Sequence, residues 1–287
     1  MSSKNWEDLV ALNSQSEPVF NLLEPAKAYE AGDKRREWFR DLDFANALEA
    51  DTWPLPETKD REGYSGPHHF AYWASGFRDA SNLLEAAKNH GTEISSYLDL
   101  GCASGRVIRH LPHIDPSIDT WGCDINRLHV EWCNLNLGPE IKVFQNHSIP
   151  NLPMADNSLD MISAFSVFSH IEAFETAWLM EMRRILRPGG IAWITVHSEH
   201  TLADMTEDWP LWRPVMSHPE IYNLINQDRT FDGNRLTVRW QTDGSYSSNV
   251  FYKQDYLKKV WGKFFEVLEV RRQFPQYQDA MILRKRE

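Results

Sequence analysis

The residues with the clearest chemical potential lie in the stretch YLDLGCASGR, where an apolar segment runs into a turn that holds Gly101 and Gly105. Glycines at such a turn permit tight backbone geometry, and the amide groups at the start of a following helix favour an anion. Asp124 follows about 20 residues later, at the end of the next predicted strand, where a carboxylate can bind both hydroxyls of a ribose. Together these features predict a site for an adenosine-type ligand. A helix-capping role for Asp124, ahead of Asn126, is the alternative.

Ala103 occupies a position in this loop where a nucleotide fingerprint usually has glycine. A pyrophosphate needs very close backbone approach at that glycine, which the side chain of Ala103 would impede, whereas a single carboxylate is less demanding. The loop and the acid by themselves do not separate NAD from S-adenosylmethionine. Ala103 favours the ligand with the smaller anion.

The elements that must position these residues alternate between strand-like and helix-like patterns, which predicts a mainly parallel sheet with helices on both faces. A helix is predicted over 70–89. It is followed by strands over 96–100, 120–123, 141–144, 159–165, 191–196, 265–270 and 279–283, and by helices over 106–111, 127–136, 173–186 and 254–261.

Two segments fall outside this alternation. Residues 1–66 are charged and irregular, with a helix-like piece over 34–50, and are predicted to be an N-terminal extension that packs on or closes over the main domain. Residues 200–248 contain prolines and two Asp-Gly pairs, with at most one helix near 219–227 and a strand near 236–241. This second segment is too long for an ordinary connection.

Composition narrows the possible partners. The formal charge of -11 argues against nucleic acid, because binding to phosphates draws most of its affinity from Lys and Arg. The three cysteines form no CxxC pair, and an odd number fits no complete disulfide framework, so a reducing cytoplasm is predicted. No basic segment followed by an apolar core starts the chain, and no apolar run is long enough to span a bilayer. The oligomeric state stays open.

Four motifs occur in order: YLDLGCASGR, WGCDINRLHVEWC, NLPMADNSLDMISAFSVFSH and EMRRILRPGGIAWITVHSEH. In this order they resemble the class I S-adenosylmethionine-dependent methyltransferases, and most closely the glycosyltransferase-associated group, which shares segments like SVFSHI and AWLMEMRRILRPGGIAWITVH. The resemblance implies a Rossmann-like, seven-stranded, mostly parallel α/β sheet with an antiparallel last strand and helices on both faces. The implied cofactor is S-adenosyl-L-methionine.

The resemblance also implies roles for individual residues. The amino acid end of the cofactor would be surrounded by Asp99, Gly101, Ala103 and Gly105, with the ribose on Asp124. The ribose or adenine would lie near Asn126 and Arg127, and the side of the adenine near Asn146, His147 and Ser148. Many relatives have an acid in this last segment, so an amide or a backbone carbonyl is expected to recognise the adenine amino group here. Phe165 and Ser166 would lie beside the transferring methyl group.

His170 is the first candidate for a general base, because SVFSH places it just beyond the fourth strand, where the cofactor methyl should point. The alternative is a histidine that caps or packs the following helix. His197, Glu199 and His200 follow the fifth strand and could supply a base or contact the substrate instead. Two histidines three residues apart raise the question of a metal site, but no third ligand is evident and none is predicted.

Residues 67–287 are therefore predicted to form the methyltransferase domain, with 200–248 as an inserted substrate cap. Trp209, Trp212 and Tyr222 in the cap offer flat faces that suit a sugar ring, although packing of the insert's own core explains them equally well. The predicted reaction is O-methylation of a sugar hydroxyl on a glycan or glycosylated metabolite. The alternatives are methylation of another small molecule or a protein side chain, and a non-catalytic S-adenosylmethionine-binding module. An NAD dehydrogenase is disfavoured, because no second domain follows the first sheet.

Overall fold

The computed structural model describes residues 42–61, 64–207, 209, 211–218, 221–239, 248–274 and 277–287. The chain forms two compact units, Met1–Asn146 and His147–Glu287. Residues 1–41, with most of the predicted N-terminal extension and the start of its predicted helix, lie outside the described residues.

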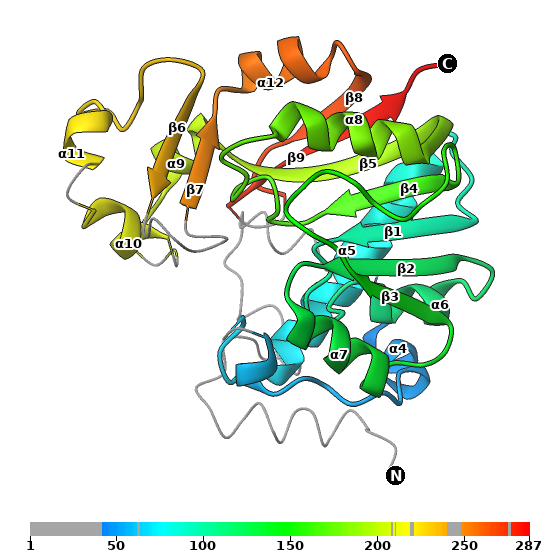
Figure 1. Ribbon diagram of the computed structural model, residues 1–287. Helices are drawn as coiled ribbons and strands as arrows, with labels where there is room; N and C mark the ends of the chain where they lie inside the picture. Colours follow the sequence, from blue (N-terminus) through cyan, green and yellow to red (C-terminus); the bar gives the residue numbers. More distant parts are fainter. Residues whose placement is uncertain are drawn as a thin grey trace. The chain divides into compact units, whose positions relative to one another are not determined.

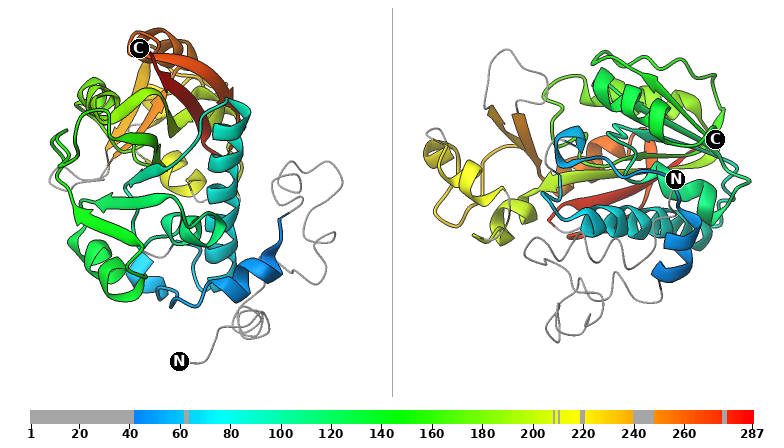
Figure 2. Two further views of the ribbon diagram at one scale, coloured as in Figure 1. Left: turned by 90° about the vertical axis from the view of Figure 1, so that its right-hand side faces the viewer. Right: turned by 90° about the horizontal axis from the view of Figure 1, so that it is seen from below.

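The first unit is built on three parallel strands, β1 (Ser96–Leu100), β2 (Asp119–Asp124) and β3 (Ile141–Gln145), in the order β3-β2-β1. Helix α7 (Arg127–Asn136) packs on β2 and β3, and helix α5 (His69–Asn89) packs on the segment that follows the glycine turn; Figure 2 shows both helices beside the strands. Every residue of β1 is buried, as expected for a parallel strand covered on both faces. The carboxyl ends of β1 and β2 carry the glycine turn and Asp124.

The helix predicted over 106–111 is wrong. A single 3₁₀ turn, η2 (Ile108–His110), is followed by the four-residue helix α6 (Leu111–Ile114), which has a proline at its start. Pro112 lies at the start of α6, where a missing N–H and a fixed φ angle are tolerated, so α-helical geometry begins there rather than at 106.

The described part of the N-terminal extension packs on α5. Helix α4 (Phe44–Ala50) contributes Leu48 to a core with the aromatic residues of α5, and η1 (Thr58–Arg61) follows it. Asp51 accepts hydrogen bonds from Trp73 Nε1 at 2.7 Å and from Arg109 Nε at 2.7 Å. The Arg109 guanidinium holds the pKa of Asp51 far below its usual value, although burial acts in the opposite direction.

The second unit contains the parallel pair β4 (Leu159–Ala164) and β5 (Leu186–Ser198). The last strand, β9 (Asp279–Lys285), runs antiparallel to β5 and to β8 (Phe265–Arg271). Helix α8 (Glu175–Ile185) packs on β5, and helix α12 (Gln254–Trp261) packs on β8 (Figure 1).

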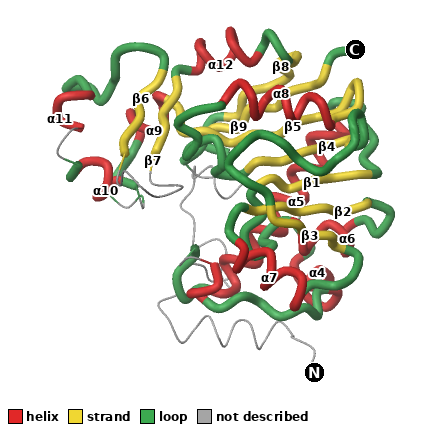
Figure 3. The backbone as a smooth tube through the Cα atoms, viewed as in Figure 1, coloured by secondary structure: helices red, strands yellow, loops and turns green. Residues whose placement is uncertain are grey.

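The predicted insert has its own small core. Helices α9 (Glu199–Asp204), α10 (Trp212–Met216) and α11 (Ile221–Leu224) precede a hairpin of β6 (Arg235–Arg239) and β7 (Ser248–Tyr252), and Figure 3 shows these short elements near the hairpin. Buried apolar residues join them, including Leu202, Val215 and Phe251. The last two residues of β5, His197 and Ser198, pair in parallel with Phe251 and Tyr252 of β7.

The predicted fold class is confirmed: the strands are mostly parallel, the last ones are antiparallel, and helices cover them. The predicted number of strands is too low, because the described residues form nine strands rather than seven. The two strands beyond those seven are β6, which corresponds to the strand predicted near 236–241 in the insert, and β7, which was not predicted.

Candidate functional site

The glycine turn after β1 is held by backbone hydrogen bonds to the neighbouring strand. The N–H groups of Gly101 and Cys102 both donate to Cys123 O, at 2.8 Å and 3.0 Å. Gly101 and Gly105 have φ angles of 77°, in the left-handed region that favours glycine. A Cβ atom at Gly105 would also lie 2.7 Å from Leu137 Cδ1. The conformation therefore favours glycine at 105, and a side chain there would also displace the end of the Leu137 side chain.

Asp124 closes this turn from the end of β2. Its carboxylate accepts the N–H of Ala103 at 2.9 Å and the N–H of Asn126 at 2.8 Å, and the residue is 5% exposed. A carboxylate offers about four acceptor positions. Helix α7 is capped by Asn126, whose side chain accepts from Leu128 N at 3.0 Å. Asp124 is thus not the N-cap residue of α7.

Ala103 adopts a φ angle of 47°, which is unusual for a residue with a side chain. The hydrogen bond from its N–H to Asp124 ties the loop to the acid in this conformation. The glycine turn and Asp124, which the sequence relates only by their spacing, are therefore joined by a hydrogen bond that orients both of them.

A second layer beneath the turn was not evident from the sequence. Ser104 Oγ bonds to Asp60 O and lies 3.0 Å from His129 Nδ1, while Tyr72 Oη donates to Ser104 O at 3.3 Å. Gly76 lets α5 approach the same loop, because a Cβ atom there would lie only 1.9 Å from Arg106 O. The one signal in the sequence is a glycine in the interior of a long predicted helix.

Arg106 directly follows the turn and has a fixed acidic partner. Its Nη1 donates to Asp79 Oδ2 at 2.6 Å, and its guanidinium lies over the ring of Tyr64 at 5.5 Å. Burial lowers the pKa of Arg106, but Asp79 outweighs it and the pKa is raised. Arg106 therefore keeps its charge, which Asp79 balances, and supports the turn from the side of α5.

The remaining residues predicted to bind the cofactor are divided between the two units. Asp99 is buried in β1, and Asn146 is buried directly after β3, with its N–H donating to Asp124 O at 3.1 Å. These two belong to the first unit with the glycine turn. His147 is exposed, and Phe165 follows β4 with its ring 6.4 Å from that of Trp193; both belong to the second unit.

His170 lies in the turn after β4 and is oriented by the hairpin. Its Nδ1 is 2.7 Å from Ser248 O. A carbonyl oxygen only accepts, so Nδ1 carries the proton and Nε2 of the neutral ring carries the lone pair. This tautomer is the one that a general base acting through Nε2 requires.

His197, near the end of β5, is held differently. It is 2% exposed, and its Nε2 lies 3.1 Å from Gln278 Nε2. The carbonyl group of Gln278 accepts from Thr195 Oγ1 at 2.7 Å, so the amide of Gln278 donates to His197 Nε2. Burial, and to a lesser extent His170, lowers the pKa of His197 to about 3. His197 is therefore uncharged at neutral pH, and its lone pair is already engaged.

The aromatic residues predicted to contact substrate pack on the core of the insert. Trp209 and Trp212 are partly buried against it; Trp209 lies 5.6 Å from the ring of Tyr277, and Arg229 lies 5.5 Å over the ring of Trp212. Tyr222 lies in α11, and its side chain is outside the described part of the structure. Both tryptophans therefore pack on the insert's own core, which the sequence offered as the alternative to contact with substrate.

Within the described ranges, no group of three or more His, Cys, Asp or Glu side chains is arranged to hold a metal ion. No helix in the same ranges is both long enough and apolar enough to cross a membrane. All three cysteines are free and buried.

One family model matches the part of the chain that runs from β1 into β5. Residues 98–194 match the family model described as a methyltransferase domain. No curated protein matches the chain.

Solved structures share the fold at low sequence identity. An S-adenosylmethionine-dependent methyltransferase from Clostridium acetobutylicum has a TM-score of 0.51 at 13% identity, covering 76% of this chain and 92% of that one. An S-adenosylmethionine-dependent methyltransferase from Methanosarcina mazei has a TM-score of 0.48 at 15% identity, covering 70% and 97%. A putative sarcosine dimethylglycine methyltransferase from Galdieria sulphuraria has a TM-score of 0.48 at 13% identity, covering 73% and 86%.

The fold is that of the Rossmann-like class I methyltransferases. Residues 98–194 carry the match to the methyltransferase-domain model, and the fold agrees with that match. The resemblance drawn from the four sequence motifs is confirmed at this level.

Proposed function

We propose that this methyltransferase acts on a hydroxyl group of a sugar in a glycan or a glycosylated metabolite, and that His170 is its general base. The observation that carries the proposal is the 2.7 Å contact between His170 Nδ1 and Ser248 O. A hydroxyl must lose its proton as the new bond forms, whereas an amine or thiolate has a nucleophilic lone pair without such help. A histidine held with its lone pair on Nε2 suits the hydroxyl.

The residues of the first unit fit S-adenosylmethionine. Gly101 and Gly105 give the turn its left-handed backbone geometry, and the carboxylate of Asp124 lies at the same turn, where it offers acceptor oxygens to ribose hydroxyls. When bound, the cofactor supplies a methyl group already activated on a sulfonium. We propose that Asp99 and Ala103 line its amino acid end and that Asn126 and Asn146 lie along the nucleoside.

The residues of the chain then have two tasks: they orient the cofactor and the acceptor, and they remove the proton of the acceptor hydroxyl. Asp124 and the turn fix the nucleoside, and alignment of reacting groups is worth several kcal/mol, about 7 in favourable systems. His170 accepts the acceptor's proton at Nε2, while Ser248 O stabilises the N–H of the resulting imidazolium. His197, whose pKa is lowered to about 3, is the weaker candidate for the base, and we propose that it positions Gln278 and the end of β5.

The proposed domain arrangement follows the sequence. Residues 1–66 are an N-terminal extension, 67–287 are the methyltransferase domain, and 200–248 are a substrate cap whose Trp209, Trp212 and Tyr222 face the acceptor. A cytoplasmic location also remains a proposal; three free cysteines support it.

The test uses labelled S-adenosylmethionine with a panel of methyl glycosides and glycosylated small molecules. The wild-type protein is expected to yield O-methylated sugars. His170→Asn keeps a donor for Ser248 O and removes the base, so turnover is expected to fall about 100-fold or more while the affinity for S-adenosylhomocysteine stays within about two-fold. Transfer only to amines or thiols, or near-normal turnover in His170→Asn, would contradict the proposal.

A further inference from the structure

Arg61 is a buried cation at the end of η1, in the part of the N-terminal extension that packs on α5. The residue is 2% exposed. Its Nη2 donates to Gly66 O at 2.6 Å, while its Nη1 lies 3.4 Å from both Pro56 O and His69 Nδ1. Its Nε has no hydrogen-bond partner among the described residues. Two carbonyl groups and an imidazole carry no negative charge, so these contacts leave the charge of Arg61 unbalanced.

No Asp or Glu side chain in the described ranges lies within ion-pair distance of this guanidinium. Glu57, on the same segment, is 73% exposed and pairs instead with Lys59 Nζ at 3.3 Å. Burial lowers the pKa of Arg61, but an arginine keeps its proton at neutral pH. A buried charge without a counter-charge is costly, and an anionic ligand would supply the missing partner.

The N-terminus of α5 adds a second positive feature at the same place. Arg61 Nη1 approaches His69, which is the first residue of this 21-residue helix. The N-cap residue, His68, makes no side-chain capping hydrogen bond, and the first turn of α5 contains no acidic residue. The positive end of the helix dipole therefore lies beside a buried guanidinium. Both features favour an anion between them.

Two contacts join this cation to the glycine turn. The guanidinium lies 4.8 Å from the ring centroid of Tyr72, and Tyr72 Oη donates to Ser104 O at 3.3 Å. The carbonyl group of Asp60, the residue before Arg61, accepts from Ser104 Oγ. Ser104 is part of the turn that we propose to surround the amino acid end of the cofactor. Arg61 is therefore held beside that turn.

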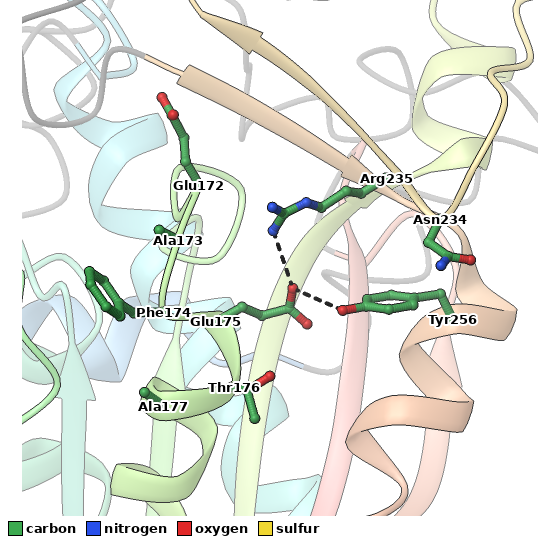
Figure 4. Close-up of a pocket in the computed structure, with 9 residues that line it drawn as sticks. All are labelled: Glu172, Ala173, Phe174, Glu175, Thr176, Ala177, Asn234, Arg235 and Tyr256. Atoms are coloured by element: carbon green, nitrogen blue, oxygen red, sulfur yellow. Dashed lines mark hydrogen bonds and ion pairs between the residues drawn. The ribbon is translucent and has the colours of Figure 1, made fainter.

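A pocket of about 680 Å³ in the second unit shows the opposite arrangement of charge. Its lining includes Glu172, Glu175 and Arg235, and Figure 4 shows the last two turned toward each other. Glu175 pairs with Arg235 Nη1 at 3.8 Å, and Glu172 pairs with Arg239 of β6. The charges of this pocket are thus balanced within the protein, whereas that of Arg61 is not.

We propose that Arg61 binds the carboxylate group at the amino acid end of S-adenosylmethionine, beside the N-terminus of α5. The inference rests on the proposed cofactor. A guanidinium presents its donors in a planar fork that matches a carboxylate, and the unpartnered Nε is one of these donors. The methyltransferase-domain match assigns no such role, because Arg61 lies outside residues 98–194.

The test compares two ligands by calorimetric titration of the full chain. S-adenosylhomocysteine carries the carboxylate, whereas methylthioadenosine has the same nucleoside and sulfur without the amino acid end. We expect Arg61→Met to lose about ten-fold or more in affinity for S-adenosylhomocysteine and to stay within about two-fold for methylthioadenosine. A residue that only supports the fold would weaken both ligands alike.

Arg61→Lys keeps the charge and removes the fork, so we expect an intermediate loss, again for S-adenosylhomocysteine alone. This variant supplies the same comparison if Arg61→Met does not fold. Lys59→Met is the matched control, because it makes the same change of charge on η1 at a side chain that is 76% exposed. It is expected to bind both ligands as the wild type does.

Equal weakening of both ligands, or unchanged affinity for S-adenosylhomocysteine, in the Arg61 variants would overturn the inference and leave the proposed cofactor standing. A wild-type protein that binds neither ligand would overturn the proposed cofactor and the inference together.

Discussion

Replacing Gly76 by alanine sets two physical effects against each other at the contact between α5 and the cofactor loop. In an isolated helix the change is favourable by about 1 kcal/mol, because alanine has the higher helix propensity. In the folded protein the added Cβ atom would lie 1.9 Å from Arg106 O and 2.9 Å from His110 Nε2, whereas ordinary contacts begin at 3.4 Å. Backbone atoms form the closest contact, so no side-chain rotation relieves it.

The size of the effect follows from the required movement. Helix α5 and the segment after the glycine turn must part by roughly 1.5 Å, and interiors packed at crystal-like density do not absorb such a shift. Overpacking costs about 1–3 kcal/mol, and more where backbone must move. After the gain in propensity, we expect Gly76→Ala to lose about 2 kcal/mol of unfolding free energy and about 4–8 °C in melting temperature.

The assay combines thermal unfolding with calorimetric titration of S-adenosylhomocysteine. Because Arg106 directly follows Gly105, we expect the affinity of Gly76→Ala for this ligand to fall together with its stability. Glu85→Ala, an exposed substitution on the same helix, is the control and should change stability by no more than about 0.5 kcal/mol. A Gly76→Ala protein as stable as the wild type, with normal affinity, would refute the close approach of α5 to the loop.

Two further predictions concern the loop and the buried histidine. Ala103→Gly removes a Cβ atom at a φ angle of 47°, and we expect S-adenosylmethionine affinity within about ten-fold of wild type by calorimetry; a much larger gain would mean that the native loop is impaired. For His197, the unfolded chain takes up a proton near pH 6.5 and the folded chain only near pH 3, so its stabilising contribution is complete above pH 6.5 and is lost as pH falls. The loss is at most about 1.4 kcal/mol per pH unit, and chemical denaturation at several pH values should show a shallower decline below pH 6.5 for His197→Gln than for the wild type. Parallel curves for the two proteins would show that His197 is not buried as described.

Elements with strong local signals were predicted almost to the residue. The predicted helices 127–136 and 254–261 coincide with α7 and α12, and the strand 96–100 coincides with β1. For α7 the reason is an N-cap asparagine directly before the apolar pattern. The helix predicted over 106–111 was wrong, because α-helical geometry begins only at α6, where Pro112 suits the first turn.

The catalytic proposals show the limit of sequence reasoning more clearly. His170 and His197 each follow a predicted strand, and the sequence ranks His170 first only because of its expected place beside the cofactor methyl group. The structure separates them through partners far along the chain: Ser248 orients His170, and Gln278 engages the lone pair of His197. The proton positions of both rings, and the low pKa of His197, depend on these contacts and on burial.

The sequence by itself predicted the fold class, because the glycine turn, its acid and the following strands are contiguous motifs whose chemistry is local. Only the tertiary structure decided that the lone pair of His197 is engaged by Gln278 and that Gly76 must lack a side chain. Each of these depends on atoms brought together from distant parts of the chain. Burial and long-range hydrogen bonds set their chemistry, and no spacing along the sequence records such contacts.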